Sequence, residues 1–365
     1  MVSKTLSTTQ NNIAPALLVW FAQYGRHDLP WQKPRSAYRV WVSEIMLQQT
    51  QVTTVIPYFE RFMQAFKDVN ELATAPIDTV LHQWTGLGYY ARARNLHKAA
   101  QQIQQQHAGR FPTEYEAVLA LPGIGPSTAG AILAQAFGQR HAILDGNVKR
   151  VLSRLHAIEG WPGQKKVEQV LWAIAEKNTP EQDLVNYTQA IMDLGATVCK
   201  RTQPQCDQCP LSEQCQAHAT GTETLYPTPK AKKTKPVKET CMLMIMDEGG
   251  RILLEQRPPS GIWGGLWSFP ECQPDDDPAD WCHSHLALSI TSTQALPALR
   301  HTFSHYHLDI EPVCLQAAPI SSPMVMDTER LFWYNMRKPD ERGLPAPIKT
   351  LLETLAVEYE PPKLE

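Results

Sequence analysis

The stretch Leu121-Pro-Gly-Ile-Gly-Pro-Ser-Thr-Ala129 decides the fold of the first half of the chain. Gly123 and Gly125 permit a sharp turn between two helices. The helix that follows, opening near Ser127 or Thr128, presents backbone N–H groups that have no partner inside the helix and therefore attract anions. An ordinary glycine-containing turn between helices is the simpler alternative. The stretch predicts a helical hairpin suited to gripping phosphate.

Apolar residues at helical spacing surround this turn. They recur in the segments 13–24, 37–48, 51–66, 90–107, 127–137, 145–156 and 180–194. We expect Pro57 to kink or divide its helix, and Gly86 and Gly88 to form a turn before Tyr89. The pattern predicts an all-helical domain, and its glycine turn looks like the helix-hairpin-helix element that contacts the DNA backbone without reading sequence.

Four cysteines close the helical region: Cys199, Cys206, Cys209 and Cys215. Thiolates at such spacing bind either an iron-sulfur cluster or zinc. A zinc ribbon usually has two Cys-x2-Cys knuckles, whereas only one occurs here, so the spacing favours a 4Fe-4S cluster over zinc, and both over disulfides. The other four cysteines are scattered, and no secretory signal or apolar run of transmembrane length is seen, so we expect a reduced, cytoplasmic protein.

The 365 residues allow two domains, and the charges divide along the chain. Residues 241–365 carry 9 Lys+Arg against 18 Asp+Glu, whereas residues 227–240 carry 5 against 1. We expect a helical domain over 1–225, a Pro/Lys-rich extended linker over 226–239, and an α+β domain over 240–365. The last domain shows short apolar runs at 241–246, 251–255, 308–315 and 331–335, then a helical pattern near 347–356. Nucleic acid should contact the first domain and the linker.

Two carboxylates stand out in the helical half. Asp145 lies where a helix should start, so a helix N-cap is its ordinary role, although a carboxylate held by helix N–H groups also suits the stabilisation of positive charge. Glu44 lies among apolar residues on nearly every side of its helix, which would bury its carboxyl and raise its pKa, as a general acid requires. The alternative is that Glu44 lies on the solvent-exposed face of the helix.

These residues together resemble the adenine DNA glycosylases of the MutY type, within the endonuclease III superfamily, over nearly the whole chain. The resemblance rests on motifs in the family's order: Ser43-Glu-Ile-Met-Leu-Gln-Gln-Thr50, Trp84-Thr-Gly-Leu-Gly-Tyr-Tyr-Ala-Arg-Ala-Arg94, the turn at 121–125, Asp145-Gly-Asn-Val-Lys-Arg150, the four cysteines and Phe303-Ser304-His305. It implies a helical glycosylase domain with a 4Fe-4S cluster on these cysteines, followed by a domain similar to the Nudix hydrolases.

The resemblance also implies an activity, the excision of adenine mispaired with 8-oxoguanine or guanine in duplex DNA during base excision repair. Glu44 would protonate the extruded adenine while Asp145 stabilises the oxocarbenium-like sugar. The remaining roles implied are adenine-pocket contacts by His27, Trp31 and Gln189; duplex entry by Gln49 and Tyr89; contacts to the oxidised guanine by Leu47, Thr50, Phe303, Ser304 and His305; and backbone contacts by Gly123, Gly125 and Ser127.

Two departures refine this expectation. Ser127 stands where bifunctional relatives carry a lysine nucleophile, which predicts a monofunctional glycosylase. The pattern of carboxylates that Nudix hydrolases use for metal-dependent pyrophosphate cleavage is absent after Pro270, where Glu271-Cys-Gln-Pro-Asp-Asp-Asp277 follows, so the C-terminal domain should recognise the lesion instead. His301, His305 and His307 could share a strand face, but no carboxylate or cysteine with ligand spacing joins them, which disfavours a metal site.

Other functions stay open on the residues alone. One is a thymine or uracil mismatch glycosylase or an endonuclease III-like lyase, which should not need the last 125 residues. Another is a non-catalytic iron-sulfur module that binds DNA. If the chain is a glycosylase of the type it resembles, we expect its partner to be double-stranded DNA, with no membrane involved. We then expect a monomer associated with the nucleoid.

Overall fold

The computed structural model describes residues 12–231, 234–318 and 330–358. The chain forms two compact units, one of residues 1–73 and 98–232 and the other of residues 74–97 and 233–365. Lys232 and Lys233 of the expected linker lie outside the described residues. No pattern in the sequence indicated that the segment 74–97 would pack with the C-terminal residues.

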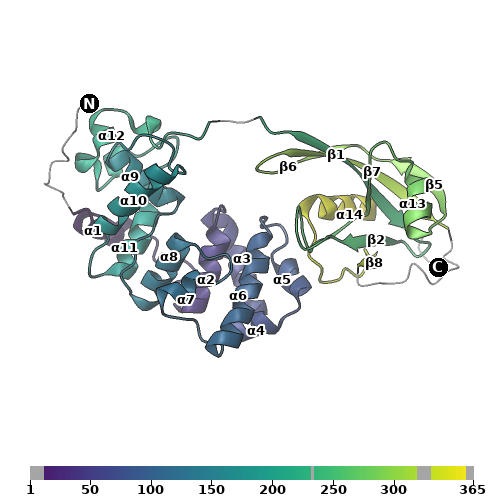
Figure 1. The fold of residues 1–365 in the computed structure, drawn as a ribbon, viewed down its shortest axis with the longest axis horizontal. Helices are drawn as coiled ribbons and strands as arrows, with labels where there is room; N and C mark the ends of the chain where they lie inside the picture. The colour runs from purple at the N-terminus through teal and green to yellow at the C-terminus, as the bar shows by residue number, and fades with distance from the viewer. Residues whose placement is uncertain (1–11, 232–233, 319–329, 359–365) are drawn as a thin grey trace. The chain divides into compact units, whose positions relative to one another are not determined.

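The first unit is helical, as Figure 1 shows. Its helices are α1 (Ala14–Tyr24), α2 (Ala37–Leu47), α3 (Val52–Ala65), α7 (Tyr115–Leu119), α8 (Pro126–Phe137), α9 (Gly146–Leu155), α10 (Lys165–Asn178), α11 (Leu184–Asp193) and α12 (Gln216–Ala219), while α4 (Val69–Thr74) and α6 (Ala91–His107) run into the segment 74–97. A π-helical turn, Leu194–Val198, extends α11 toward the cysteines. A core formed by buried residues of α1, α8, α9, α10 and α11 holds these helices together.

Pro57 does not divide its helix. The helix α3 runs from Val52 to Ala65 with Pro57 inside it. A proline removes one backbone N–H from the helical ladder, but Val55, Phe59 and Phe62 are fully buried on one face and anchor both sides of the proline to the core. Tertiary packing therefore overrides the local breaker signal in this helix.

The second unit contains a mixed sheet and several helices. Its elements are α5 (Ile77–Gln83), β1 (Val237–Met246), β2 (Arg251–Gln256), β3 (Trp267–Ser268), β4 (Glu271–Cys272), α13 (Pro278–Leu286), β5 (Ile290–Ala295), β6 (Leu299–Thr302), β7 (His307–Ala317), β8 (Leu331–Asn335) and α14 (Ala346–Glu358). The strands β1 and β7 pair in parallel over ten residues, and the other pairs are antiparallel. The expected α+β domain is confirmed, although α13, β5 and β6 had no clear sequence signal.

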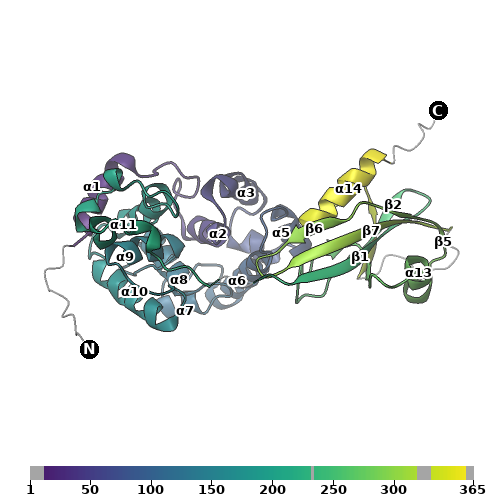
Figure 2. The ribbon, with the colours of Figure 1, turned by 90° about the horizontal axis from the view of Figure 1, so that it is seen from above.

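The strand β1 shows why both faces of this sheet are covered. Residues 241–246 are all buried, and Cys241, Leu243 and Ile245 share one apolar cluster with Cys282 of α13. Because side chains alternate along a strand, Met242, Met244 and Met246 face the other side. Figure 2 draws α14 and α13 on opposite sides of the β1 and β7 strands. Among the described residues, no helix is long and apolar enough to span a membrane.

Candidate active site

A cavity of about 980 Å³ opens in the helical unit between the end of α2, the start of α8, the start of α9 and the end of α11. It brings together many of the residues singled out in the sequence: Trp31, Glu44, Leu47, Gln49, Thr50, Ser127, Asp145 and Gln189. Lys200 and Arg201 of the cysteine loop also line it, so its rim carries positive charge. The two carboxylates therefore share one cavity that can hold a nucleoside.

Glu44 projects into this cavity from α2. The residues around it on the helix, including Trp41, Ile45 and Met46, are buried, and Glu44 itself is half-buried, so protein surrounds much of the carboxyl. This burial, together with the negative charge of Asp145, raises the pKa of Glu44 to about 7, while a hydrogen bond donated by Gln135 works in the opposite direction. The Gln135 Nε2 to Glu44 Oε1 distance is 3.0 Å. Much of Glu44 therefore holds a proton at neutral pH.

Asp145 faces the same cavity as the N-cap of α9. Its Oδ1 accepts a hydrogen bond from the Val148 backbone N–H at 2.8 Å, and its Oδ2 accepts one from Asn147 Nδ2 at 3.2 Å. Burial raises the pKa of Asp145, and these hydrogen bonds and the charge of Arg150 oppose that rise. Two carboxylates in one cavity do not both ionise readily, and Asp145 has more donors to support its negative charge. The geometry therefore favours a protonated Glu44 beside an ionised Asp145.

A chain of hydrogen bonds runs from Asp145 to the cysteine region. Asn147, which donates to Asp145, accepts a hydrogen bond from Arg150 Nη2 at 2.8 Å. The same guanidinium donates to the backbone oxygens of Cys199 at 2.7 Å and Gly195 at 2.6 Å. A Cβ on Gly195 would lie 2.5 Å from the Asn147 Cβ, so only glycine allows this close approach. The position of Asp145 is thus tied to the loop that begins at Cys199.

The glycine turn meets the cavity at Ser127. Gly123 has a φ of 81°, which glycine adopts without strain, and α8 begins at Pro126. At Gly125 a Cβ would meet nothing within 4 Å, so the backbone there lies open to a ligand. Ser127 Oγ accepts a hydrogen bond from the Leu144 backbone N–H at 2.9 Å, which joins the turn to the segment that leads into Asp145.

The four cysteine thiols surround a second, small cavity. Burial and then Glu223, with smaller contributions from Cys209 and Cys199, raise the pKa of Cys206 to about 12, and burial with Cys199 and Cys215 raises that of Cys209 to about 11. Arg154, which is 2% exposed, donates to Cys199 Sγ at 3.3 Å and to the backbone oxygens of Lys200 and Arg201. Four converging cysteine sulfurs, which would repel one another as thiolates, form a donor set that fits a cationic metal centre.

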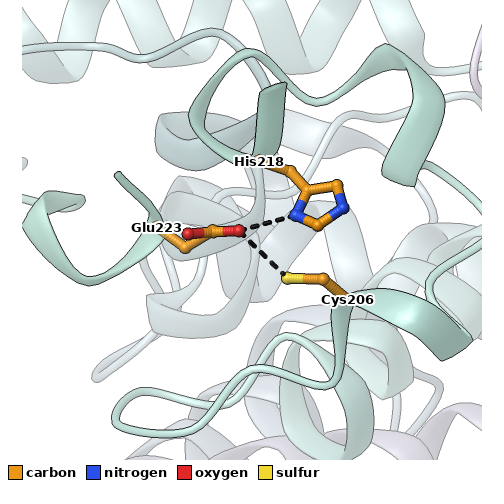
Figure 3. Close-up of side chains that lie close together, drawn as sticks. All are labelled: Cys206, His218 and Glu223. Carbon is orange, nitrogen blue, oxygen red and sulfur yellow. Dashed lines mark hydrogen bonds and ion pairs between the residues drawn. The ribbon is translucent and has the colours of Figure 1, made fainter. Parts of the chain in front are cut away.

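A carboxylate and an imidazole lie beside Cys206, as Figure 3 shows. Glu223 Oε1 lies 2.6 Å from His218 Nδ1 and 3.6 Å from Cys206 Sγ. The ligand atoms of all three residues lie within 4.8 Å of one another. The sequence reasoning did not anticipate this group, because neither His218 nor Glu223 continues the cysteine spacing. His218 and Glu223 thus add two polar side chains beside the cysteine site.

The residues that the resemblance assigns to lesion recognition lie on a hairpin of the second unit. Phe303 N donates to Tyr306 O at 2.9 Å and closes the turn between β6 and β7. Ser304 and His305 are exposed at its tip, with 3.3 Å between Ser304 Oγ and His305 Nδ1. Phe303 packs against Trp263, His301 and Tyr306, so a cluster of aromatic side chains supports the tip. The hairpin presents two polar side chains on a firm support.

The structure distributes the predicted residues over the large cavity, the cysteine site, the glycine turn and the second unit. The large cavity holds both carboxylates, Trp31 and Gln189, but His27 does not line it: its Nε2 lies 2.9 Å from Phe21 O and its ring packs on Phe21. Tyr89, Ser304 and His305 belong to the second unit. The sequence reasoning missed Gln135, whose spacing from Thr128 and Ala131 along α8 places all three on one helix face.

Gln135 provides a test of the Glu44 environment. Replacing it by leucine removes the hydrogen bond that lowers the Glu44 pKa, so that pKa should rise further. A general acid works while protonated and fails as pH rises through its pKa, so the alkaline limb of the rate profile of Gln135→Leu should move to higher pH by about one unit. Single-turnover rates across pH measure the shift. Gln105→Leu, an exposed position on α6, is the control, and an unmoved limb in Gln135→Leu contradicts the assignment.

Comparison with known proteins first defines the class. Residues 42–177 match the family described as HhH-GPD superfamily base excision DNA repair protein, and residues 241–354 match the NUDIX domain. The helical unit is similar to a solved thermostable thymine-DNA glycosylase, with a TM-score of 0.51, 26% identity, and coverage of 57% of this chain and 95% of that one. The protein is therefore a DNA N-glycosylase with a helix-hairpin-helix domain followed by a Nudix-like domain, as the sequence predicted.

Full-length relatives then give the family. The adenine DNA glycosylase of Buchnera aphidicola (subsp. Acyrthosiphon pisum) is 38% identical over 337 residues, covering 92% of this chain and 95% of the relative. The adenine DNA glycosylase of Homo sapiens is 36% identical, covering 80% of this chain and 65% of the relative. The chain belongs to the family of adenine DNA glycosylases, enzymes of base excision repair.

Proposed function

We propose that this protein is a monofunctional glycosylase that removes adenine opposite 8-oxoguanine or guanine in duplex DNA. The observation that carries the proposal is the pairing of Glu44 and Asp145 in one cavity, with the raised pKa on Glu44. Adenine is a poor leaving group until protonated, and breaking its N-glycosidic bond leaves positive charge on the sugar. Glu44 donates the proton to the extruded adenine, and Asp145 stabilises the sugar until water attacks.

The cavity walls suit a flipped purine. Trp31 is buried at 2% exposure and offers an apolar surface, while Gln189 supplies an amide. Gln189 Nε2 donates to Asp193 Oδ1 at 2.8 Å, and Asp193 also pairs with Arg26, so the amide is held in place. We assign Trp31 and Gln189 to adenine binding. His27, which contacts Phe21 and does not line the cavity, is left out of this assignment.

Other residues of the two units would contact the rest of the duplex. Gln49 has a φ of 61° and Tyr89 a φ of 50°, conformations that non-glycine residues rarely adopt and that often mark functional positions. We assign these two to duplex entry, with Leu47 and Thr50 facing the oxidised guanine. Gly123, Gly125, Lys200 and Arg201 contact phosphates, through backbone N–H groups in the turn and charge in the loop.

The product should be an abasic site and not a cut strand. A lyase forms a Schiff base through a lysine amine, and the corresponding position here is Ser127, whose hydroxyl already accepts the Leu144 N–H. Ser127 therefore serves the turn and the DNA backbone. Excision is followed by release of the abasic strand without cleavage.

A panel of duplexes tests the proposal. Adenine opposite 8-oxoguanine and adenine opposite guanine should both yield strand breaks, and only after alkali, because alkali cleaves abasic sites. Thymine opposite guanine and adenine opposite thymine should stay intact. Excision of thymine opposite guanine would support a mismatch thymine glycosylase instead, and breaks without alkali would support a lyase. Duplex binding with no excision of any base would leave a non-catalytic module.

We propose that Cys199, Cys206, Cys209 and Cys215 hold a 4Fe-4S cluster. Such a cluster would brace the loop between Cys199 and Cys215 and supply no step of the hydrolysis. The chain's own residues prepare this loop: Arg154 fixes its backbone from α9, and Arg150 joins the Cys199 carbonyl to the helix start at Asp145. The loop thereby presents Lys200 and Arg201 at the cavity rim.

Metal analysis of the purified protein tests the cluster. We expect about four irons per chain with broad visible absorption, because four cysteines hold a cubane of four irons. Cys206→Ser should lose most of the iron and the colour. Cys314→Ser, at a buried cysteine of β7, should keep both. One zinc per chain, or full iron in Cys206→Ser, would contradict the assignment.

The hairpin tip should read the oxidised base. We assign Phe303, Ser304 and His305 to contact with 8-oxoguanine, because the tip is exposed, polar and firmly supported. In His305→Ala the ratio of excision rates opposite 8-oxoguanine and opposite guanine should fall by about tenfold, the size of one base contact. His283→Ala, exposed on α13, is the matched control. An unchanged ratio in His305→Ala would dismiss the assignment.

Duplex DNA as the substrate places the enzyme with the chromosome. We propose that it works as a monomer associated with the nucleoid in the cytoplasm, since one chain supplies the cavity, the phosphate contacts and the hairpin. Sedimentation of the protein with one duplex should give a complex of one chain per lesion.

A further inference from the structure

The turn that carries Tyr89 is held in an uncommon conformation. It lies between α5 and α6 in the second unit, and Gly86, Gly88 and Tyr89 all have positive φ values, of 96°, 76° and 50°. The first two are glycines and adopt such angles freely, but a tyrosine does so only where its surroundings impose it. Tyr89 is also 48% exposed, so the constraint comes from the backbone around it and not from burial of its ring.

Part of this constraint is internal to the turn. The Gly88 carbonyl accepts hydrogen bonds from Trp84 Nε1 at 3.1 Å and from Arg92 Nη2 at 3.0 Å. The Arg92 guanidinium lies 5.4 Å from the ring centroids of both Trp84 and Tyr89. These contacts fix the peptide that precedes Tyr89 and steady its ring.

The other part comes from the C-terminal residues of the same unit. Tyr90, the neighbour of Tyr89, is 8% exposed, and its hydroxyl lies 3.3 Å from Gly86 N, as acceptor, and 3.0 Å from Leu344 O, as donor. Arg94 Nη1 donates to Gly264 O at 2.6 Å. The Tyr90 hydroxyl thus joins Gly86, at the start of the turn, to the loop before α14. The Arg94 guanidinium, in the first turn of α6, joins the other end to the loop before β3.

The helix α5, which precedes the turn, packs closely against the C-terminal loops. A Cβ at Gly343 would lie 2.6 Å from the Leu81 Cβ, so this approach requires glycine. Trp267 Nε1 donates to Asp78 Oδ1 at 3.3 Å, and Trp267 N donates to Gly343 O at 3.0 Å. The C-terminal loops therefore make close contacts and hydrogen bonds with the residues on both sides of the Tyr89 turn.

We propose that Tyr90 and Arg94 are positioning residues through which the C-terminal domain holds the Tyr89 turn ready to enter the duplex. The inference rests on the proposed role of Tyr89 and goes beyond it, because it gives the Nudix-like domain a part in extruding adenine as well as in reading the opposite base. A turn already held in shape loses little conformational entropy when it enters DNA. Loosening it should slow extrusion and leave the later bond cleavage unchanged.

The test uses the full chain and a duplex with adenine opposite 8-oxoguanine and 2-aminopurine beside the adenine. Stopped-flow fluorescence reports unstacking, and acid-quenched samples report adenine release. Tyr90→Phe keeps the ring in the core and removes only the hydroxyl. Arg94→Ala removes the hydrogen bond to the Gly264 carbonyl. Each should slow unstacking by about tenfold, as expected for one lost buried hydrogen bond. Arg251→Ala, which breaks the Arg251–Asp247 pair on the same sheet, should leave the rate unchanged.

A double-mutant cycle separates positioning from general loosening. In a Tyr89→Ala background, both substitutions should have no further effect on unstacking, because they act through Tyr89. An equal slowing with and without Tyr89 would overturn the inference. So would normal unstacking in Tyr90→Phe and Arg94→Ala while Tyr89→Ala is slow, and that outcome would leave the proposed function standing. Normal unstacking in Tyr89→Ala itself would remove the duplex-entry assignment and the inference with it.

Discussion

Glu44→Gln should lower the single-turnover rate of adenine release by about a thousandfold, the effect expected for loss of a general acid. Glutamine keeps the size of the side chain and can still hydrogen-bond in the cavity, but it has no proton to donate to the leaving adenine. Binding of the mismatched duplex should therefore change little. Quenched-flow measurement of free adenine, with binding measured separately by fluorescence anisotropy, checks both expectations.

The control for this substitution is Glu60→Gln, at an exposed position on α3 in the same unit. It should excise adenine at the normal rate. Glu44→Gln retaining more than about a tenth of the rate would exclude Glu44 as the acid, since acid catalysis contributes at least about a hundredfold. The structure would then need another proton donor in the cavity.

Asp145→Asn should be the second severe substitution, with a loss of about a thousandfold in single-turnover release, as seen when a group that stabilises developing charge is removed. Asparagine caps helices nearly as well as aspartate, so α9 should begin at the same residue and the thermal unfolding midpoint should change little. A large loss of activity without a loss of stability separates the chemical role of Asp145 from its structural one.

The chain offers a matched control for this substitution. Asp277 caps α13 by accepting from the backbone N–H groups of Ala279 and Asp280. Asp277→Asn makes the same chemical change at a helix start of the second unit and should leave excision unaffected. Asp145→Asn should also lower the pKa of Glu44, because the charge of Asp145 raises it. Near-normal excision by Asp145→Asn would reduce Asp145 to a helix cap.

Local pattern was a good guide to the helical half of the fold. The glycine turn, the helix start at Asp145 and the apolar setting of Glu44 are properties of neighbouring residues, and the structure has each of them. Pro57 does not divide its helix, because its local penalty is small beside the burial of Phe59 and Phe62 on the same helix. The short strands β5 and β6 are mostly exposed, so they lack the apolar alternation that reveals a strand.

The site was predictable only where its residues stand in recognisable motifs. Gln135 belongs to no motif quoted from the sequence, and its role depends on α8 packing beside α2, which is a tertiary fact. The packing of residues 74–97 with the C-terminal loops depends on contacts between positions more than 150 residues apart, such as Arg94 with Gly264. Periodicity and spacing describe neighbours along the chain, so they do not predict such contacts.

The central claim is that a protonated Glu44 beside an ionised Asp145 drives adenine excision. The most direct measurement is the pH dependence of the single-turnover rate of adenine release by the unmodified protein, from a duplex with adenine opposite 8-oxoguanine. Because the pKa of Glu44 is raised to about 7, the rate should be lost as pH rises through about 7, falling by about tenfold per unit above it. A rate that stays level well above pH 7, or that rises there, would contradict the claim.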